Sequence, residues 1–346
     1  MFAVPPYASN EESVHEIILR VLHWSSMADG GAPVSLFRIS NLDEVLSDSQ
    51  CWPIEPDLQA LFELYNLSHV FAVHDIVRSY TSLFARLELW GDQHPEVVEC
   101  NAIELQPDIL AQQQQHPAII NHSKMVYMNQ AFYESRNADK AAFVASALPH
   151  MGPLSTVLNG EIIEIEGRNS DDIELPFSLS QNVRLLDRID DIETFVPAEI
   201  HWDAAEKNED LFVAISFGCL TLSKANGQPI SLSDVPRFSI GSNFYSSLQN
   251  IQAGPGQPRA HLLLECCCRI VLGIPKNEIK AMGKPAQTVR VKDQATAWRT
   301  HVTKKHEGSR LMLWQSKGIF EFANVGVKLE EHIESGNSQG CYSHYW

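Results

Sequence analysis

The residues best suited to bind or cleave a phosphate ester lie close together near the C-terminal end of the sequence. Arg299 and His301 are two positions apart in a predicted β-strand, residues 296–303. Because side chains alternate between the two faces of a strand, these two are expected on one face. A turn containing a glycine leads to a second predicted strand, residues 309–315, which has Arg310 near its start.

This predicted hairpin contains the groups that nucleic-acid binding requires. Arginine and lysine neutralise phosphates, and tryptophan offers a ring on which a base can stack. Histidine can deprotonate a 2′-hydroxyl near neutral pH, while cations stabilise the charged phosphate during cleavage. We therefore predict catalytic roles for Arg299, His301 and His306. The residues predicted to bind nucleic acid are Lys292, Arg299, Lys304, Lys305, Arg310 and Trp314.

A curved sheet carrying arginine, lysine and histidine resembles, in layout and in no motif, the toxin ribonucleases that cleave messenger RNA on the ribosome. The resemblance implies ribonuclease activity at the hairpin. Two alternatives remain open. The basic residues are also those of a solvated edge strand, where lysines prevent aggregation, or of a surface that pairs with an acidic protein.

A second candidate is the adjacent pair His74 and Asp75 in a predicted helix. The pair resembles the central residues of the His-Asp-domain phosphohydrolases, in which they ligate a metal. That family also needs an earlier histidine and a later aspartate, and none here has a recognisable context. The resemblance implies a metal-dependent phosphohydrolase. The alternative is a histidine that belongs to a packed helix.

Other motifs carry less information. His201 and Asp203 are two positions apart, as an aspartate that orients a catalytic histidine would be, and the loop 254–259 precedes a helix that could hold an anion at its N-terminus. The sequence has no phosphate-binding loop, nucleophile elbow or His-Glu-x-x-His motif. We assign no metal-binding residue and no cofactor on these grounds.

Charge is distributed unevenly along the chain. The formal net charge is −17, but residues 276–317 contain ten basic and three acidic residues. That segment therefore carries +7, and the remaining residues together carry −24. Asymmetry of this kind determines which partners bind and where, rather than the fold. The acidic remainder would repel nucleic acid, and the basic segment would orient it.

The bulk composition is that of a globular protein with two or three domains. Of the 346 residues, 44% are hydrophobic and 20% charged, and no apolar stretch is long enough for a membrane helix. Residues 1–10 lack the pattern of a signal peptide. The seven cysteines are odd in number and form no Cys-x-x-Cys motif. We expect free thiols, a cytoplasmic location and no membrane contact.

Hydrophobic periodicity predicts helices in the first part of the chain and strands in the last. Helical spacing begins at Val14, Leu58 and Val70, continues over 125–147 and returns over 258–273. Strands are predicted at 161–166, 211–217, 220–222, 296–303, 309–315 and 319–325. The expected class is α+β, with a helical N-terminal half, a mixed middle and a small antiparallel basic β module at the C-terminus.

These patterns predict a helical domain over 1–150, a mixed domain over 151–275, a basic β meander over 276–331 and a flexible tail over 332–346. We expect a cytoplasmic protein that engages nucleic acid through the basic hairpin, with ribonuclease or nuclease activity, within a larger assembly. The alternative is a non-enzymatic subunit that binds another protein. A phosphohydrolase that uses His74 and Asp75 is the third hypothesis.

Overall fold

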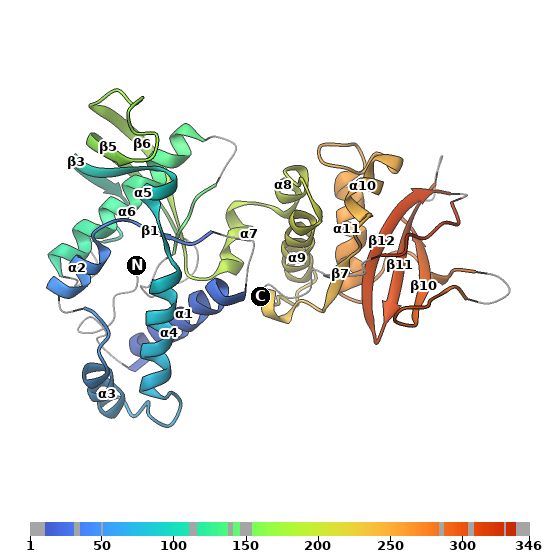
Figure 1. Ribbon diagram of the computed structural model, residues 1–346, viewed down its shortest axis with the longest axis horizontal. Helices are drawn as coiled ribbons and strands as arrows, with labels where there is room; N and C mark the ends of the chain where they lie inside the picture. The colour runs from blue at the N-terminus through green and yellow to red at the C-terminus, as the bar shows by residue number, and fades with distance from the viewer. Residues whose placement is uncertain are drawn as a thin grey trace. The chain divides into compact units, whose positions relative to one another are not determined.

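The computed structural model divides the chain into two compact units, which we call unit 1 (Met1–Asp191) and unit 2 (Ile192–Trp346) (Figure 1). The structure describes residues 11–30, 35–49, 51–110, 116–137, 141–145, 154–283, 287–303, 308–328 and 330–336. Each unit has its own core and is described separately. No helix within these ranges has the length and apolar character needed to cross a membrane.

Unit 1 combines helices with two sheets, of which the larger is mostly antiparallel. Its helices are α1 (Glu11–Gly30), α2 (Leu42–Asp48), α3 (Glu55–Leu64), α4 (Val73–Arg86), α5 (Trp90–Gln93), α6 (Pro117–Arg136) and the 3-10 helix η1 (Ile189–Asp191). Its strands are β1 (Phe37–Arg38), β2 (Glu88–Leu89), β3 (Pro95–Gln106), β4 (Val144–Ala145), β5 (Leu154–Gly167) and β6 (Phe177–Leu186).

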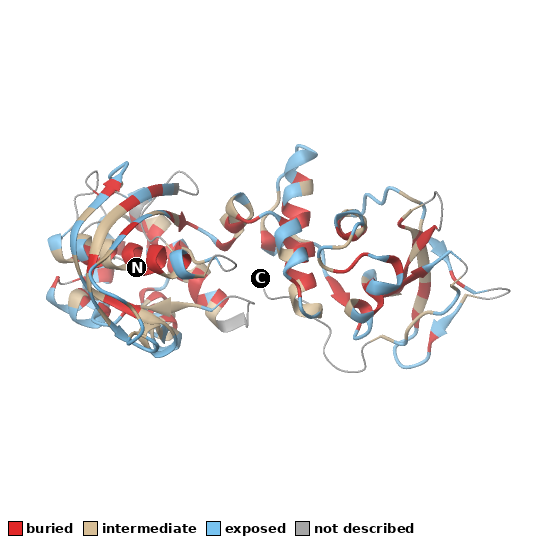
Figure 2. Ribbon diagram, turned by 90° about the horizontal axis from the view of Figure 1, so that it is seen from above, coloured by how far each residue is buried: buried red, intermediate tan, exposed pale blue. Residues whose placement is uncertain are grey.

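One core cluster of unit 1 lies between α6 and one face of its larger sheet. Among the described residues this sheet has the order β3-β5-β6-β4, with β5 antiparallel to both β3 and β6. Met128 and Phe132 of α6 pack in one buried cluster with Leu158 and Ile162 of β5. Figure 2 colours the buried residues of the chain red. Burial of apolar area on this face stabilises unit 1.

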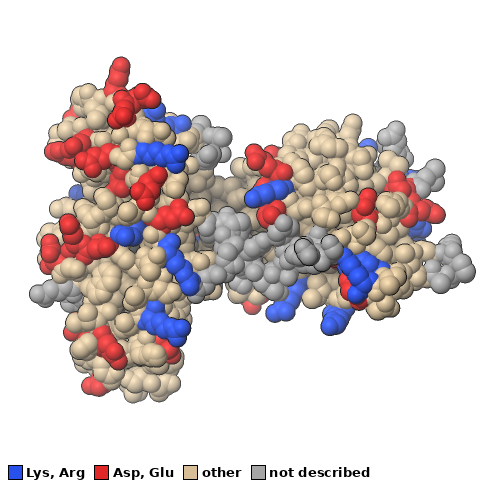
Figure 3. Space-filling model, viewed as in Figure 1, with Lys and Arg blue, Asp and Glu red and all other residues tan. Residues whose placement is uncertain are grey.

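The outer face of this sheet is acidic. Glu99 of β3 lies directly opposite Glu164 of β5, and Glu161 lies opposite Asn101. Acidic side chains gather at the end of unit 1 formed by β3, β5 and β6 (Figure 3). Like charges directly opposite one another destabilise a strand pair, so this face contributes charge rather than stability.

Unit 2 places helices against a second sheet. Its helices are α7 (Ile192–Phe195), α8 (Ala198–Asp203), α9 (Asn208–Ala225), α10 (Phe244–Ser247) and α11 (Ala260–Val271), with the 3-10 helices η2 (Leu232–Asp234) and η3 (Leu248–Ile251). Its strands are β7 (Phe238–Ile240), β8 (Lys280–Ala281), β9 (Val289–Arg290), β10 (Ala295–His301), β11 (Ser309–Ser316) and β12 (Ile319–Val327).

The described strands of unit 2 form a six-stranded sheet of order β7-β12-β11-β10-β8, with β9 also paired to β10. One face of this sheet packs on the helices through aromatic rings. Phe322 of β12 lies 5.9 Å from Phe238 of β7 and 5.7 Å from Phe244 of α10, measured between ring centroids. Phe212 of α9 stacks on Phe238 at 4.5 Å. The opposite face carries the basic side chains.

The predicted strands at 211–217 and 220–222 are wrong, because these residues belong to the helix α9. Residues 211–220 are all buried. A helix that is buried on every side has no polar stripe, so its sequence is a continuous apolar run with no helical period. Acidic residues in its first turn and Asp210, which accepts from the backbone N–H groups of Glu206 and Lys207, mark the start of the helix.

The α+β class is confirmed, with a largely helical first part and a C-terminal meander of β10, β11 and β12. The chain is nevertheless grouped differently from the expected domains. β3 pairs with β5 across residue 150, and the unit boundary follows residue 191. β7, from the expected middle domain, pairs in parallel with β12. The meander therefore belongs to the same sheet as part of that domain.

One buried histidine makes the stability of unit 1 sensitive to pH. His122 of α6 is 3% exposed, and neither ring nitrogen has a hydrogen-bond partner among the described residues. Burial lowers the pKa of His122 from 6.5 to about 4, because the charged imidazolium loses its hydration. Between these two pH values the unfolded chain binds the proton and the folded chain does not. The contribution of His122 to the free energy of unfolding is therefore fully present above pH 6.5 and is lost as the pH drops toward 4.

We predict that His122→Leu reduces this pH dependence. Lowering the pH from 7 to 5 should reduce the free energy of unfolding of unit 1 in both proteins. The reduction should be about 2 kcal/mol larger in the wild type than in the variant. Thermal unfolding midpoints at the two pH values measure the difference. His69→Leu is the control, because His69 is exposed. Equal pH dependence of the wild type and His122→Leu would contradict the assignment.

Candidate nucleic-acid interface

The strand register brings together three of the residues singled out in the sequence. His301 of β10 lies directly opposite Arg310 of β11, and Arg299 lies opposite Met312. Because directly opposite residues point to the same side of a sheet, Arg299, His301 and Arg310 share one face. All three are half-buried. On the other side of β10, Lys280 of β8 lies opposite Arg299. We call the surface formed by Lys280, Arg299, His301 and Arg310 the basic strip.

The two arginines of the basic strip lack a carboxylate partner in the part of the chain that the structure describes. No acidic side chain there lies within 4.0 Å of Arg299 or Arg310. Partial burial and the nearby charge of Arg299 lower the pKa of Arg310 from its ordinary value. Two guanidinium groups that repel each other are unfavourable for the fold. Such a pair suits a surface that receives an anion from outside.

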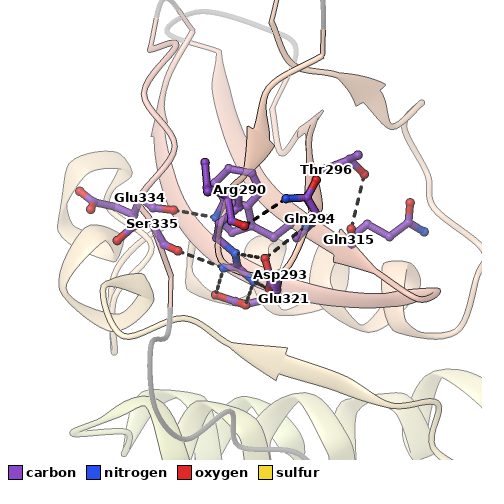
Figure 4. Close-up of polar contacts among 11 residues, drawn as sticks. Arg290, Asp293, Gln294, Thr296, Gln315, Glu321, Glu334 and Ser335 are labelled. Atoms are coloured by element: carbon purple, nitrogen blue, oxygen red, sulfur yellow. Dashed lines mark hydrogen bonds and ion pairs between the residues drawn. The ribbon is translucent and has the colours of Figure 1, made fainter.

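Arg290, by contrast, is a structural residue. Its side chain is 9% exposed and donates to Glu321 at 2.9 and 2.8 Å and to Asp293 at 2.9 and 2.6 Å. Nη1 also donates to the carbonyl of Ser335 at 3.0 Å. These contacts are drawn in Figure 4. The Arg290 guanidinium lowers the pKa of Asp293. This cation is therefore neutralised within unit 2.

The expectation that Trp314 stacks on a base does not fit its position. Trp314 is 4% exposed, its Nε1 donates to the carbonyl of Glu334 at 2.7 Å, and its ring lies under Arg290 at 5.0 Å. Both ring faces are thus in the interior of unit 2. Trp298 is half-buried and lies on the opposite face of β10, where its Nε1 donates to Thr296 at 2.9 Å. Neither tryptophan belongs to the basic strip.

The C-terminal segment 330–336, whose residues 332–336 were expected in the flexible tail 332–346, lies along the sheet face that carries the basic strip. Asn324 of β12 holds it at two points, accepting from the N–H of Glu334 at 3.0 Å and donating to the carbonyl of His332 at 3.4 Å. Ile333 packs on the small core that includes Met312. Residues 337–346 lie outside the described residues.

The remaining predicted residues do not all join the strip. Lys292 is in the turn between β9 and β10, shortly before the first residue of β10. His301 is the last residue of that strand, so Lys292 lies at the other end of β10. Lys304, Lys305 and His306 lie outside the described residues. Lys280, which the strip includes, was missed because the sequence around β8 has no strand pattern. Only the pairing of β8 with β10 shows its place.

The His74 and Asp75 pair lies at the exposed start of α4. Their side chains are 64% and 65% exposed and 3.6 Å apart. No group of three histidine, cysteine, aspartate or glutamate side chains placed to hold a metal occurs among the described residues. The structure therefore supplies no third ligand for the phosphohydrolase hypothesis within those residues.

His201 and Asp203 point to different partners. The ring of His201 stacks on Phe217 at 5.1 Å, and burial lowers the pKa of His201. Asp203 instead contacts Nε2 of His261 at 2.8 Å and accepts from the N–H of Gly256 at 2.9 Å. The aspartate thus joins α8 to the start of α11 and the loop before it. The sequence pattern does not form a dyad.

No known family model, curated protein or solved structure compared with the chain gives a significant match.

We predict that Arg290→Met strongly destabilises unit 2. The variant leaves Glu321, which is 4% exposed, buried without its cation, and breaking a buried pair in this way typically costs about 3–5 kcal/mol. Chemical denaturation measures the free energy of unfolding. Arg269→Met is the matched control, because Arg269 forms a more exposed pair with Glu265 one helical turn away, and such pairs contribute less than about 1 kcal/mol. Similar losses in the two variants would show that the Arg290 network is not structural.

Proposed function

We propose that the protein binds nucleic acid through the basic strip of unit 2. The observation that carries the proposal is the position of Arg299 and Arg310, which lie near each other on one sheet face with no carboxylate within 4.0 Å among the described residues. An external phosphate would relieve their repulsion and form charge-assisted hydrogen bonds with both. His301, opposite Arg310, adds a group that can donate to phosphate oxygens when protonated.

Two further features favour a phosphate polymer over a single small anion. The strip runs across three neighbouring strands, β8, β10 and β11, so its cations are spread over about 10 Å. In the sequence, Lys304 and Lys305 come three and four positions after His301, the last residue of β10. They add two positive charges to the segment between β10 and β11. A row of cations of this kind matches successive phosphates of a nucleic-acid backbone.

The acidity of the rest of the chain is consistent with binding at one place. Residues outside 276–317 carry a net charge of −24, which disfavours contact of a polyanion with other surfaces. We also propose a cytoplasmic location. The described cysteines are free, and Cys267 and Cys268 are buried in α11, where burial raises the pKa of both thiols. Such thiols suit a reducing compartment.

Phosphodiester cleavage is a second candidate function at the same strip. The position of His301 opposite Arg310 favours it, because a base and a cation on adjacent strands could contact one phosphodiester. His301 would accept the proton of the 2′-hydroxyl as its oxygen attacks phosphorus. The 5′-oxygen would leave and take a proton from water.

We predict that Arg299→Ala together with Arg310→Ala weakens binding to a fluorescent RNA or DNA oligonucleotide by at least tenfold near 50 mM salt. Each neutralised phosphate releases a counterion, so the slope of log K against log salt should become shallower by about one unit per lost contact. Anisotropy titrations over a series of salt concentrations measure both quantities.

The matched control is Arg237→Ala. Arg237 is exposed and precedes β7, which lies at the edge of the sheet opposite β8, so its loss removes the same charge away from the strip. If the double variant and Arg237→Ala bind equally well, the strip is not the binding surface. If no oligonucleotide binds but a basic-strip-dependent protein complex is recovered, the alternative of a protein-binding subunit replaces the proposal.

Cleavage is tested with His301→Ala on single-stranded RNA and DNA. Loss of an acid–base group commonly lowers a rate by about 10²–10⁴, and a thermal unfolding midpoint equal to that of the wild type shows that the variant is folded. A rate that is unchanged in a folded variant would exclude His301 as the base. Binding without cleavage by the wild type would leave nucleic-acid binding as the function.

A further inference from the structure

The basic strip is bordered by carboxylates on the side of β12. Gly326 lies directly opposite Arg310 in the next strand, and the side chain of Glu330 packs over it. A β-carbon at residue 326 would approach Cγ of Glu330 to 2.7 Å, so only glycine allows this packing. Glu331, the next residue, lies near enough to favour the charged form of Arg310 and is exposed. The carboxylates of Glu330 and Glu331 therefore lie about one strand away from Arg310, on the side of β12.

The position of these carboxylates is fixed by the segment that carries them. The N–H of Glu330 donates to the carbonyl of Val327 at 2.9 Å, and Oε1 of Glu330 accepts from the N–H of His332 at 3.0 Å. Further along, Asn324 and Arg290 hold the segment as described above. The segment crosses the sheet face from the Gly326 end toward Trp314 and covers part of it.

The opposite border is the edge strand β8. Lys280 there forms an ion pair with Glu278 at 3.0 Å, and the Glu278 side chain is 75% exposed. β8 is the last strand on this side of the described sheet. Among the described cations of the basic strip, Arg299 and Arg310 on the two central strands thus have no carboxylate within 4.0 Å, and a carboxylate lies on each side of them.

We propose that the basic strip accepts one nucleic-acid strand and rejects a duplex, with Glu278 and Glu331 as specificity-determining residues. This inference depends on the proposed function and names its substrate class. Neighbouring strands of a sheet are about 4.8 Å apart, so the two borders are separated by about three spacings, or roughly 15 Å. One phosphate backbone fits between them, over the arginines.

A duplex presents a second row of phosphates that the strip does not accommodate. The grooves of B-form DNA are about 6 and 12 Å wide, so phosphates across a groove fall beyond the arginines when one strand is centred on them. On either side those phosphates meet the carboxylate of Glu278 or of Glu331. Like charges brought together in this way exclude a partner at little cost to the correct one. A single strand can turn its bases away from both borders.

The experiment compares a 12-nucleotide DNA with the same strand in a duplex, by anisotropy near 50 mM salt, with the full chain. We expect the wild type to bind the single strand at least tenfold more tightly. Glu278→Gln together with Glu331→Gln should raise duplex affinity about five- to tenfold and single-strand affinity less than about threefold, so that the ratio of the two affinities falls. The control is Glu199→Gln with Glu206→Gln, which removes two exposed carboxylates from the helical side of unit 2 and should leave the ratio unchanged.

Three outcomes separate this inference from the proposed function. Equal wild-type affinity for the two forms, with binding still dependent on Arg299 and Arg310, would overturn the single-strand inference and leave nucleic-acid binding intact. An unchanged ratio in the Glu278 and Glu331 variant would show that these carboxylates do not set specificity. Absence of any binding that depends on the two arginines would overturn the proposed function and this inference together.

Discussion

The buried contact between Arg290 and Glu321 is the constraint on which the candidate interface depends. It links β9 to β12, and through the carbonyl of Ser335 it also fixes segment 330–336. Removing two charges from water is costly, and the mutual attraction offsets this only with good hydrogen-bond geometry. Arg290 meets that condition with four hydrogen bonds to the carboxylates of Glu321 and Asp293. At one end of the sheet face the charge of Arg290 is therefore fully compensated, and segment 330–336 is bound there.

The other end of the same face is positive because carboxylates near β10 are already engaged by other cations, while Glu331 lies beyond 4.0 Å from Arg310. Asp293 and Glu321 are both held by Arg290, and Glu278 is paired with Lys280. Arg299 and Arg310 are left without a partner within 4.0 Å in the described chain. On this one surface, the charge of Arg290 is compensated by carboxylates of the same unit, whereas Arg299 and Arg310 repel each other. Arg290 therefore stabilises the fold, and the other two arginines can bind an external group. That difference is the strongest argument for an external anion.

The sequence could predict the positions of Arg299, His301 and Arg310 because a strand has a period of two. Alternation alone assigns the side chains of a short hairpin to faces, and the register confirms that assignment. The sequence could not distinguish the roles of Arg290 and Arg299, which look alike in a basic segment. Their difference depends on Glu321 and Ser335, which are more than thirty residues away from Arg290. For the same reason Trp314 could not be recognised as an interior residue.

Long-range pairing also explains the errors in the predicted fold. β3 was not predicted as a strand because its side chains do not alternate regularly. Register shifts occur between Val97 and Glu104, and each extra residue moves the following side chains to the other face. Its backbone there is held by Asn129 of α6, whose Oδ1 accepts from the N–H of Val97 at 2.8 Å. The helix α9 was predicted as strands for a different reason. It is buried on every side, so its sequence lacks the polar positions that would show a helical period.

The range of electrostatic forces determines which charges control the candidate interface. At physiological salt the Debye length is about 8 Å, so charges of the acidic chain that lie farther away are largely screened at the strip. Glu278 and Glu331 flank the strands next to β10 and β11, one strand spacing (about 4.8 Å) away, and remain inside that range. At low salt the Debye length rises to about 30 Å at 0.01 M, and the net charge of −24 outside residues 276–317 also acts on a polyanion. General repulsion then opposes the approach of any nucleic acid, whereas the proposed discrimination between one strand and two depends on the two nearby carboxylates and weakens as added salt shortens the Debye length.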